Sequence, residues 1–257
     1  MSFIKFLGTA GARFVMIDQL RSSGGVWINC GKTNVILDPG PGSLVRCHAS
    51  RPKLDPKKLD AVILTHKHLD HSGDANVMIE AMTKGGFEKR GCLFAPKDAF
   101  GPRGVIFSYL KNFPGKTIKL DKGERYSVGD LSFTAAVKNI HPVDTYGLKF
   151  FIEDEIISFV ADTRYFPGLI AAHKDATVLI LNVVFYDKRN DIDHMAIQEA
   201  IELIKAIKPK KAILTHFGLS MLKQKPYLIE RDLQAGLGMD VQLAYDGYTL
   251  NLPLDRD

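Results

Sequence analysis

Three histidines and one aspartate fall within six consecutive residues of this chain, at His66, His68, Asp70 and His71. Neutral imidazole nitrogens and a carboxylate suit zinc, and they also suit manganese or iron. His66 and His68 are two residues apart, so an extended backbone aims both side chains to the same side. Asp70 and His71 then follow a turn and are expected to face a second point nearby. The spacing therefore predicts a metal site.

The sequence around this cluster indicates the elements that hold it. The short apolar run Ala61–Leu64 just before it is typical of a buried strand. After it, apolar residues recur at helical spacing, which predicts a helix near Ser72–Lys84. The cluster is therefore expected on a loop between a strand and a helix, where a rigid scaffold can hold functional side chains.

Further ligand-type residues occur at the exits of three other predicted strands. His141, Asp162 and His216 each come at or directly after an apolar run, in the same local context as His66. If these strand ends meet at one rim of a sheet sandwich, all seven side chains come together there. The three predicted strands cover residues 131–140, 156–161 and 212–215.

Length and composition limit the class of protein. The chain has 257 residues, of which 46% are hydrophobic, and it shows no repeat or linker, so we expect a single domain over residues 1–257. No apolar run reaches the roughly 18 residues of a membrane span. The N-terminus lacks a signal-peptide pattern, so a cytoplasmic location with no membrane partner is expected.

Charge and cysteine content indicate which partners are expected and whether disulfide bonds are. The net charge of +5 favours anionic partners, but no arginine-rich stripe with interleaved aromatic residues predicts nucleic-acid binding. The three cysteines, Cys30, Cys47 and Cys92, are widely spaced and odd in number, which argues against a disulfide framework. Cys47 and His48 could form a ligand pair, but nothing nearby completes a site, so a small buried thiol is expected at Cys47.

The order of predicted elements indicates the architecture. Short strands form meanders towards both ends and alternate with helices in the middle, which predicts two sheets with helices outside. Helices are expected over Met195–Ile207 and Tyr227–Ala235, whereas a loop is expected after Gly8–Ala12. Residues 87–113 show no clear period. Two interpretations of this segment stay open, a mobile cover beside the site and an ordinary strand with a short helix.

The full set of residues resembles the metallo-β-lactamase superfamily. The hallmark of that superfamily is a His-x-His-x-Asp-His loop followed by a distant His, Asp and His at strand ends. The segments Phe6–Thr9 and Leu37–Gly40 extend the resemblance to nearly the whole chain. It implies an α+β fold, a four-layer αβ/βα sandwich in which two mixed β-sheets are flanked by helices.

The resemblance also implies a ligand set for two divalent metal ions. One ion would be held by His66, His68 and His141, and zinc is expected first, with manganese, iron or nickel compatible. The second would be held by Asp70, His71 and His216, with Asp162 bridging. Two such ions about 3.5–4 Å apart share a bridging hydroxide, because they lower the pKa of water towards about 7.

Four residues at or beside the predicted ligands are expected to help catalysis or to orient the ligands. Asp70 is expected to orient the attacking water as well as bind metal. Asp38, Thr65 and Thr215 either support the ligands from behind or cap strand ends.

A further histidine, His194, is expected to act on the substrate. It opens the predicted helix Met195–Ile207, with Asp191 or Asp193 as N-cap, and a helix N-terminus favours an anion such as phosphate. The branch of the superfamily that resembles RNase Z and the phosphonate-pathway cyclic phosphodiesterases places a histidine here. It contacts the substrate phosphate or protonates the leaving oxygen. The alternative is a surface histidine at a helix start.

The resemblance thus implies a dinuclear metal-dependent hydrolase that acts on a phosphodiester, cyclic or derived from nucleic acid. A small anionic substrate is expected, and a homodimer is compatible with the sequence. The substrate itself stays open for two reasons. Where RNase Z has a His-Glu pair, this chain has Asn182–Phe185, and where the cyclic phosphodiesterases have a cysteine cluster, it has Arg21–Ser23.

Two other functions remain open at this point. The same site could hydrolyse a carboxylic ester, a thioester or a lactone. A di-iron module that handles oxygen or nitric oxide is a further alternative, against which the absence of a fused electron-carrier domain counts.

Overall fold

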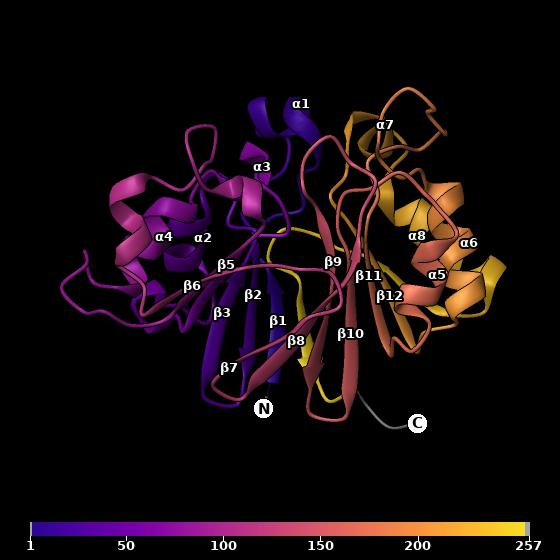
Figure 1. Cartoon of the computed structure of the whole chain (residues 1–257). Coiled ribbons are helices and arrows are strands. Elements are labelled where there is room, and N and C mark those ends of the chain that lie inside the picture. Colours follow the sequence, from indigo (N-terminus) through magenta and orange to yellow (C-terminus); the bar gives the residue numbers. More distant parts are fainter. Residues whose placement is uncertain (1, 255–257) are drawn as a thin grey trace.

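Two seven-stranded sheets pack face to face, with helices on both outer faces (Figure 1). The computed structural model describes residues 2–254. The strand order is β14-β1-β2-β3-β4-β5-β6 in the first sheet and β13-β12-β11-β10-β9-β8-β7 in the second. Each sheet mixes parallel and antiparallel pairs, so the predicted α+β four-layer sandwich is confirmed.

The first sheet contains the N-terminal strands and the last strand of the chain. Its members are β1 (Ser2–Phe6), β2 (Val26–Cys30), β3 (Thr33–Leu37), β4 (Ala61–Ile63), β5 (Cys92–Ala95), β6 (Lys116–Lys119) and β14 (Thr249–Leu252). The second sheet contains β7 (Arg125–Val128), β8 (Leu131–Lys138), β9 (Tyr146–Ile152), β10 (Glu155–Val160), β11 (Val178–Asn182), β12 (Lys211–Thr215) and β13 (Asp240–Leu243).

The helices lie outside the sheets or along one edge of the sandwich (Figure 1). They are α1 (Ala12–Ile17), α2 (Ser43–Ala49), α3 (Leu69–Ser72), α4 (Ala75–Met82), α5 (Gly168–His173), α6 (Ile197–Ile207), α7 (Leu219–Lys223) and α8 (Pro226–Leu237). Three short 3-10 helices cover Pro56–Lys58, Lys97–Ala99 and Ser108–Asn112. Within residues 2–254, no helix is both long and apolar enough to cross a membrane.

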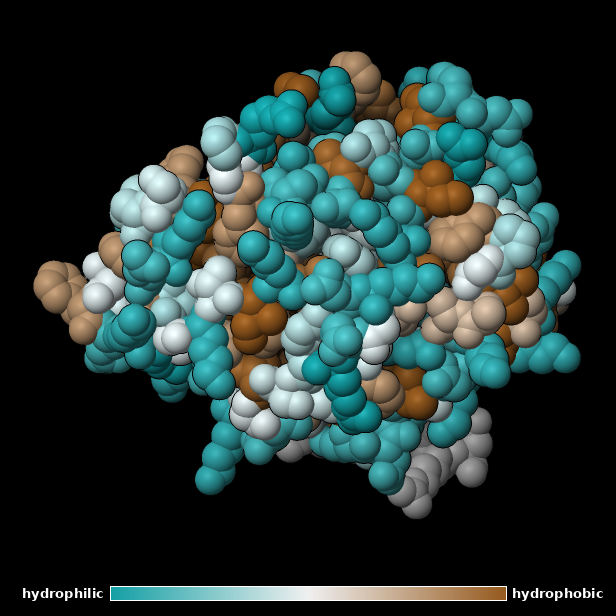
Figure 2. Space-filling view, in the orientation of Figure 1, coloured by the Kyte–Doolittle hydropathy of each residue, from teal (hydrophilic) through white to brown (hydrophobic). Residues whose placement is uncertain are grey.

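Hydrophobic residues form three layers of core. The middle layer lies between the sheets, where the ring of Phe133 packs 5.1 Å from that of Phe94 and 5.5 Å from that of Phe150, measured between centroids. One outer layer lies under α2 and α4, and the other under α5, α6 and α8. The surface seen in Figure 2 is mainly hydrophilic, with small hydrophobic groups between.

The parallel strands bring the predicted site residues to one edge of the sandwich. β3 and β4 are parallel neighbours, as are β10, β11 and β12. Leu37 pairs with Ile63, and Asn182 pairs with Thr215, so these strands end level with one another. Because the carboxyl ends of parallel strands meet at one edge, the residues that follow them gather there.

One predicted helix start is wrong. Helix α6 begins at Ile197 rather than Met195, and its N-cap is Ala196 instead of Asp191 or Asp193. Ala196 forms a β-bridge with Phe185, which holds this segment extended. The carboxylate of Glu199 accepts a hydrogen bond from the backbone N–H of Ala196 at 3.0 Å and completes the cap. His194 therefore precedes the helix and does not lie at its N-terminus.

Several other local expectations also need correction. A helix, α1, follows the glycine loop where a loop was expected, and α2, α5 and α7 were not predicted. Strand β8 ends at Lys138, before the predicted end at Ile140. Asp70 and His71 lie within the one-turn helix α3. Residues 87–113 contain β5 and two 3-10 helices with buried side chains, so the ordinary interpretation of this segment is correct.

Candidate metal centre

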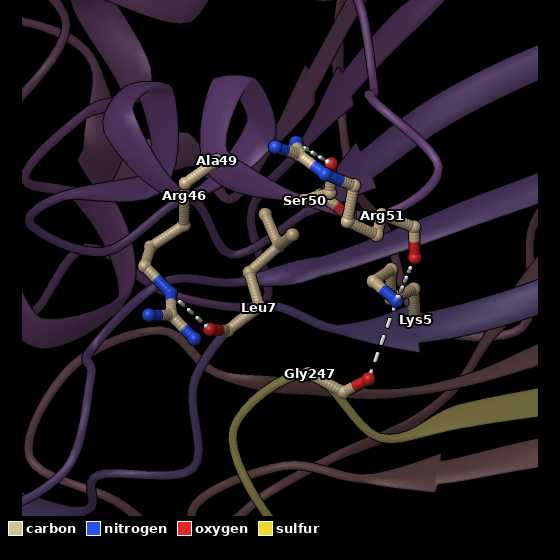
Figure 3. A pocket seen from close by; sticks show the side chains of 7 residues that line it. All are labelled: Lys5, Leu7, Arg46, Ala49, Ser50, Arg51 and Gly247. Carbon is tan, nitrogen blue, oxygen red and sulfur yellow. Dashed lines mark hydrogen bonds between the residues drawn. The ribbon is translucent and has the colours of Figure 1, made fainter.

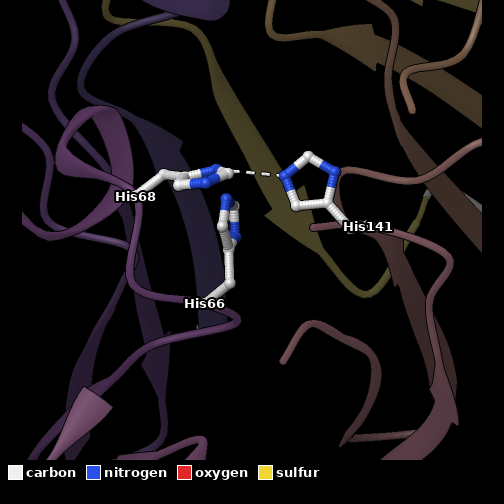
Figure 4. Close-up of side chains that lie close together, drawn as sticks. All are labelled: His66, His68 and His141. Carbon is white, nitrogen blue, oxygen red and sulfur yellow. Dashed lines mark hydrogen bonds between the residues drawn. The ribbon is translucent and has the colours of Figure 1, made fainter. Parts of the chain in front are cut away.

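Three histidines converge from two loops at the edge of the sandwich (Figure 4). His66 and His68 lie between β4 and α3, and His141 lies in the loop between β8 and β9. The Nε2 atom of His141 is 3.0 Å from the Nδ1 atom of His68. The rings of His66 and His141 have centroids 5.1 Å apart. The three side chains can offer one nitrogen each to a single metal ion.

A second group of four side chains lies directly beside the first: Asp70, His71, Asp162 and His216. The Nε2 atoms of His71 and His216 are 3.4 Å apart. Asp162 Oδ2 lies 3.4 Å from His71 Nε2, and Asp162 Oδ1 lies 3.3 Å from His216 Nε2. Asp70 Oδ2 lies 3.7 Å from His216 Nε2. The structure thus brings all seven predicted residues together.

The donor atoms fit metal ions. His66 is fully buried, and its Nε2 atom has no hydrogen-bond partner within residues 2–254, although it lies 3.8 Å from Asp162 Oδ2. An unpartnered buried nitrogen is costly unless it coordinates something. Ligands on one tetrahedral ion with bonds of about 2.0–2.2 Å stand about 3.3–3.6 Å apart, which is close to the spacing seen here.

His194 also reaches this cluster, by a different route from the one predicted. Its Nδ1 atom is 3.5 Å from Asp162 Oδ2, and its ring centroid is 5.1 Å from that of His141. The extended segment that joins β11 to α6 places it there. With His141 and Asp162 it forms a further set of three donors that can hold a metal ion.

Comparison with known proteins settles the family. Residues 33–217 match the Beta-lactamase superfamily domain, which is more than half of the chain. The chain belongs to the beta-lactamase superfamily. Within that superfamily it is a metal-binding hydrolase of the metallo-β-lactamase fold, and its His and Asp clusters can bind metal ions.

Two relatives are similar over most of the chain. An uncharacterized protein of Methanocaldococcus jannaschii is 28% identical over 97% of this chain and 98% of its own. The probable metallo-hydrolase YhfI of Bacillus subtilis is 27% identical over 76% of this chain and 80% of its own.

Solved structures share the superfamily fold. The crystal structure of YhfI superposes with a TM-score of 0.80 at 22% identity, over 97% of this chain and 98% of that one. A diphosphatase from the PhnP family gives 0.73 at 18% identity, over 99% of both chains. Human tRNase Z, short form, gives 0.70 at 18% identity, over 98% of this chain and 100% of that one. At these identities the likeness shows the fold.

Asp38 and Thr65 contact two histidines of the candidate metal centre. Asp38 Oδ1 accepts a 2.6 Å hydrogen bond from the backbone N–H of Thr65, and Asp38 Oδ2 accepts one of 2.6 Å from the Thr65 hydroxyl. Asp38 Oδ2 is also 3.0 Å from His71 Nδ1, and Thr65 Oγ1 is 3.0 Å from His66 Nδ1. Such contacts fix the ring orientation and leave the opposite nitrogen for the metal.

Backbone geometry at two of these positions is unusual. Asp38 and His216 have φ angles of +49° and +62°, in the left-handed region that favours glycine. Such conformations persist only where the surroundings enforce them, and they cluster at functional sites. At Gly40 a side chain would be impossible, because a Cβ atom would lie 2.1 Å from the carbonyl oxygen of Asp70.

Two supporting contacts had no signal in the sequence analysis. Asn182, at the end of β11, donates a 2.8 Å hydrogen bond to Asp162 Oδ1. The backbone carbonyl of Asp193 lies 3.0 Å from His141 Nδ1. Asn182 pairs with Thr215, the residue before His216, but this register is known only from the fold. Thr215 lines a cavity of about 30 Å³ next to His71 and His216, and no side-chain hydrogen bond of Thr215 is seen among the described residues.

Burial and charge set the protonation states. Burial lowers the pKa of His66 well below its usual value, and it also lowers the pKa values of His68 and His141. Burial opposes the charge of His71 as well, but Asp162 and other carboxylates hold its pKa well above normal. Despite burial, the neighbouring histidines hold the pKa of Asp162 well below its usual range. The first three histidines are therefore neutral, the form that binds metal.

Proposed function

We propose that this chain is a dinuclear metal-dependent hydrolase of phosphodiesters. His66, His68 and His141 would hold one ion, and Asp70, His71 and His216 the other. The observation that carries the proposal is the position of Asp162. Its Oδ2 atom faces His66 and His71, while its Oδ1 atom faces His216, so this one carboxylate can reach both ions.

The metal ions and the side chains would have different roles in the reaction. Two divalent ions at this site would supply a nucleophile from water at neutral pH and polarise the phosphoryl group. Asp70 would accept a hydrogen bond from the attacking water and hold it in line. His194 would donate a proton to the leaving oxygen. Burial lowers the pKa of the His194 imidazole, and a bound phosphate anion would raise it again.

Three observations favour a phosphodiester over other substrates. His194 is 15% exposed and lies beside the bridging carboxylate, where it can touch both substrate and solvent. The chain carries a net charge of +5, which favours an anionic substrate, either small or derived from nucleic acid. Two proteins of similar structure are named a diphosphatase and a tRNase Z.

The reaction class is tested by comparing substrates on purified, zinc-loaded protein. Bis(p-nitrophenyl) phosphate and a cyclic nucleotide represent phosphodiesters, and p-nitrophenyl butyrate and a lactone represent carboxylic esters. We expect kcat/KM to be highest for a phosphodiester. Faster turnover of the carboxylic esters would refute the phosphodiester assignment. Iron in the isolated protein together with a visible absorption band would favour the di-iron alternative.

The roles of ligands and proton donor are tested by metal content and turnover together. His68→Ala and Asp162→Ala should lose bound metal and turnover. Metal content is measured by inductively coupled plasma mass spectrometry. His194→Ala should keep two metal equivalents and lower kcat on the order of 100-fold for a substrate with a poor leaving group. It should have little effect with p-nitrophenolate, which leaves without protonation. Loss of metal from His194→Ala would show that this residue is a ligand and not a proton donor.

A further inference from the structure

A second cavity, of about 270 Å³, lies apart from the metal centre (Figure 3). It shares no lining residue with the small cavity beside His71 and His216. Three separate parts of the chain form its wall: β1 and the residue after it, the end of α2, and the turn before β14. The residues that carry the argument are Lys5, Leu7, Arg46, Ser50, Arg51 and Gly247.

The lining is cationic and contains no carboxylate. Lys5, Arg46 and Arg51 contribute three positive charges, and no Asp or Glu of residues 2–254 lines the cavity. Lys5 is only 7% exposed. Burial lowers its pKa, and the nearby Arg46 charge lowers it further, with no carboxylate among the causes. The charge at this cavity therefore has no counterion in its own wall.

Hydrogen bonds fix these side chains but leave donors free. Lys5 Nζ donates to the carbonyls of Arg51 at 3.2 Å and Gly247 at 3.3 Å, and to the hydroxyl of Thr249 at 3.0 Å. Arg46 uses Nε to bind the carbonyl of Leu7 at 3.0 Å. Within the described residues, its two terminal nitrogens have no hydrogen-bond partner. Three neutral acceptors hold Lys5 in place without cancelling its charge.

Ser50 adds an unpartnered polar group to the same wall. The residue is 8% exposed, and its buried Oγ atom has no hydrogen-bond partner in the part of the chain that the structure describes. A buried hydroxyl without a partner is unfavourable and is rare in folded proteins. Arg51 donates from one terminal nitrogen to the Ser50 carbonyl at 3.2 Å, and within residues 2–254 its other terminal nitrogen, like the Ser50 hydroxyl, has no hydrogen-bond partner. A ligand that accepts hydrogen bonds would satisfy both.

We propose that this cavity binds a small phosphorylated ligand, whose phosphate group sits between Arg46 and Arg51 and accepts a hydrogen bond from Ser50. Planar guanidinium groups bind phosphate oxygens in pairs. A phosphate dianion offsets three cations better than a carboxylate does. The volume exceeds that of a phosphate group alone and leaves room for a small group attached to it.

A purely structural role of these cations makes a different prediction. Lys5 and Arg51 donate to carbonyls just after the end of α2, where positive charge stabilises a helix. That role involves neither the terminal nitrogens of Arg46 nor the hydroxyl of Ser50. It predicts that removing the cations lowers stability and leaves phosphate binding unchanged.

The test is equilibrium dialysis of the metal-loaded protein against labelled inorganic phosphate and against a nucleoside 5′-monophosphate, with the unphosphorylated nucleoside as a control. Every variant keeps the metal centre and any phosphate bound there. A difference in bound phosphate between variants therefore reports on this cavity alone. The double variant Arg46→Gln/Arg51→Gln should lose one bound equivalent, with Kd raised on the order of 30-fold or more. Ser50→Ala should weaken binding by a smaller factor. Tighter binding of the nucleotide than of inorganic phosphate would identify a phosphate monoester as the ligand.

A charge-matched control separates local binding from net charge. Arg103→Gln/Arg231→Gln removes two exposed arginines elsewhere and should bind phosphate like the unaltered protein. Added phosphate should raise the Tm of the control more than that of the cavity double variant. Equal stoichiometry and Kd in the two double variants would overturn the proposal, and so would a cavity variant that loses stability but keeps its phosphate.

Discussion

His173, at the end of α5, allows a quantitative test of how burial of a histidine changes the pH dependence of stability. Its side chain is fully buried, and among the described residues neither ring nitrogen finds a hydrogen-bond partner. The ring packs on the backbone of β9, since a Cβ atom on Gly147 would lie 3.0 Å from His173 Nε2. Burial lowers its pKa from the usual 6.5 to about 3, with a further contribution from Lys149 and opposition from Asp175.

The sign of the pH effect follows from proton uptake. Between pH 6.5 and about 3, the unfolded chain protonates His173 while the folded protein keeps it neutral. The unfolded state therefore binds more protons, and this residue lowers the free energy of unfolding as the pH falls. The loss amounts to about 2 kcal/mol at pH 5 and is negligible at pH 8.

Replacement by leucine removes both the titration and the two unpartnered nitrogens. The His173→Leu variant should gain about 2 kcal/mol over the unaltered protein when the pH is lowered from 8 to 5. The measurement is urea unfolding followed by circular dichroism at four pH values, with a chelator present throughout so that metal release adds no pH dependence. His48→Leu, at an exposed position on α2, is the matched control and should show no such gain.

A difference in unfolding free energy that stays constant from pH 8 to 5 would refute this reasoning. It would mean that His173 becomes protonated in the folded protein at an ordinary pH. The ring-proton chemical shifts of His173, followed by NMR over the same pH range, give an independent check. They should not titrate above pH 5.

Three further predictions concern the metal centre. Asp38→Asn keeps the shape of the side chain but weakens its contacts with Thr65 and His71, so metal affinity should fall about 10–100-fold in competition with a chromophoric chelator. Asn182→Ala removes the donor to Asp162 and should lower metal affinity by about 1–3 kcal/mol in the same assay, with an unchanged circular dichroism spectrum. Treatment with a chelator should abolish turnover and lower the Tm, and added zinc should restore both; activity that survives complete metal removal would contradict the two-metal proposal.

Much of the candidate metal centre could be predicted because its residues can be recognised from a few neighbouring residues in the sequence. The cluster His66–His71 lies in one short stretch, a loop that runs into the one-turn helix α3, and Asp162 and His216 come just after apolar strands. The continuous apolar character of β11 and β12 marks them as buried strands of a parallel pair. Parallel strands end at one edge, so the meeting of these side chains follows from topology.

The rest depended on contacts between segments far apart in the sequence. Helical periodicity continues through Met195, yet Val184 and Phe185 donate backbone hydrogen bonds to the carbonyl of Met195 and hold that segment extended. Tertiary pairing outweighed the local pattern there, because the bridge replaces hydrogen bonds that a longer helix would have made. Asn182 could not be recognised for a similar reason. Its amide matters only because the pairing of β11 with β10 brings it within 2.8 Å of Asp162 Oδ1.

This extended segment has a consequence for the reaction. The carbonyl of Asp193 holds Nδ1 of His141, while His194, the next residue, faces Asp162. Asp193 is itself held by an ion pair with Arg164, which follows Asp162 by two residues. The backbone that orients His141, a proposed metal ligand, is thus continuous with the backbone that positions the proposed proton donor. Had α6 begun at Met195, as its sequence suggests, the bridge from Phe185 to Ala196 and this coupling would both be lost.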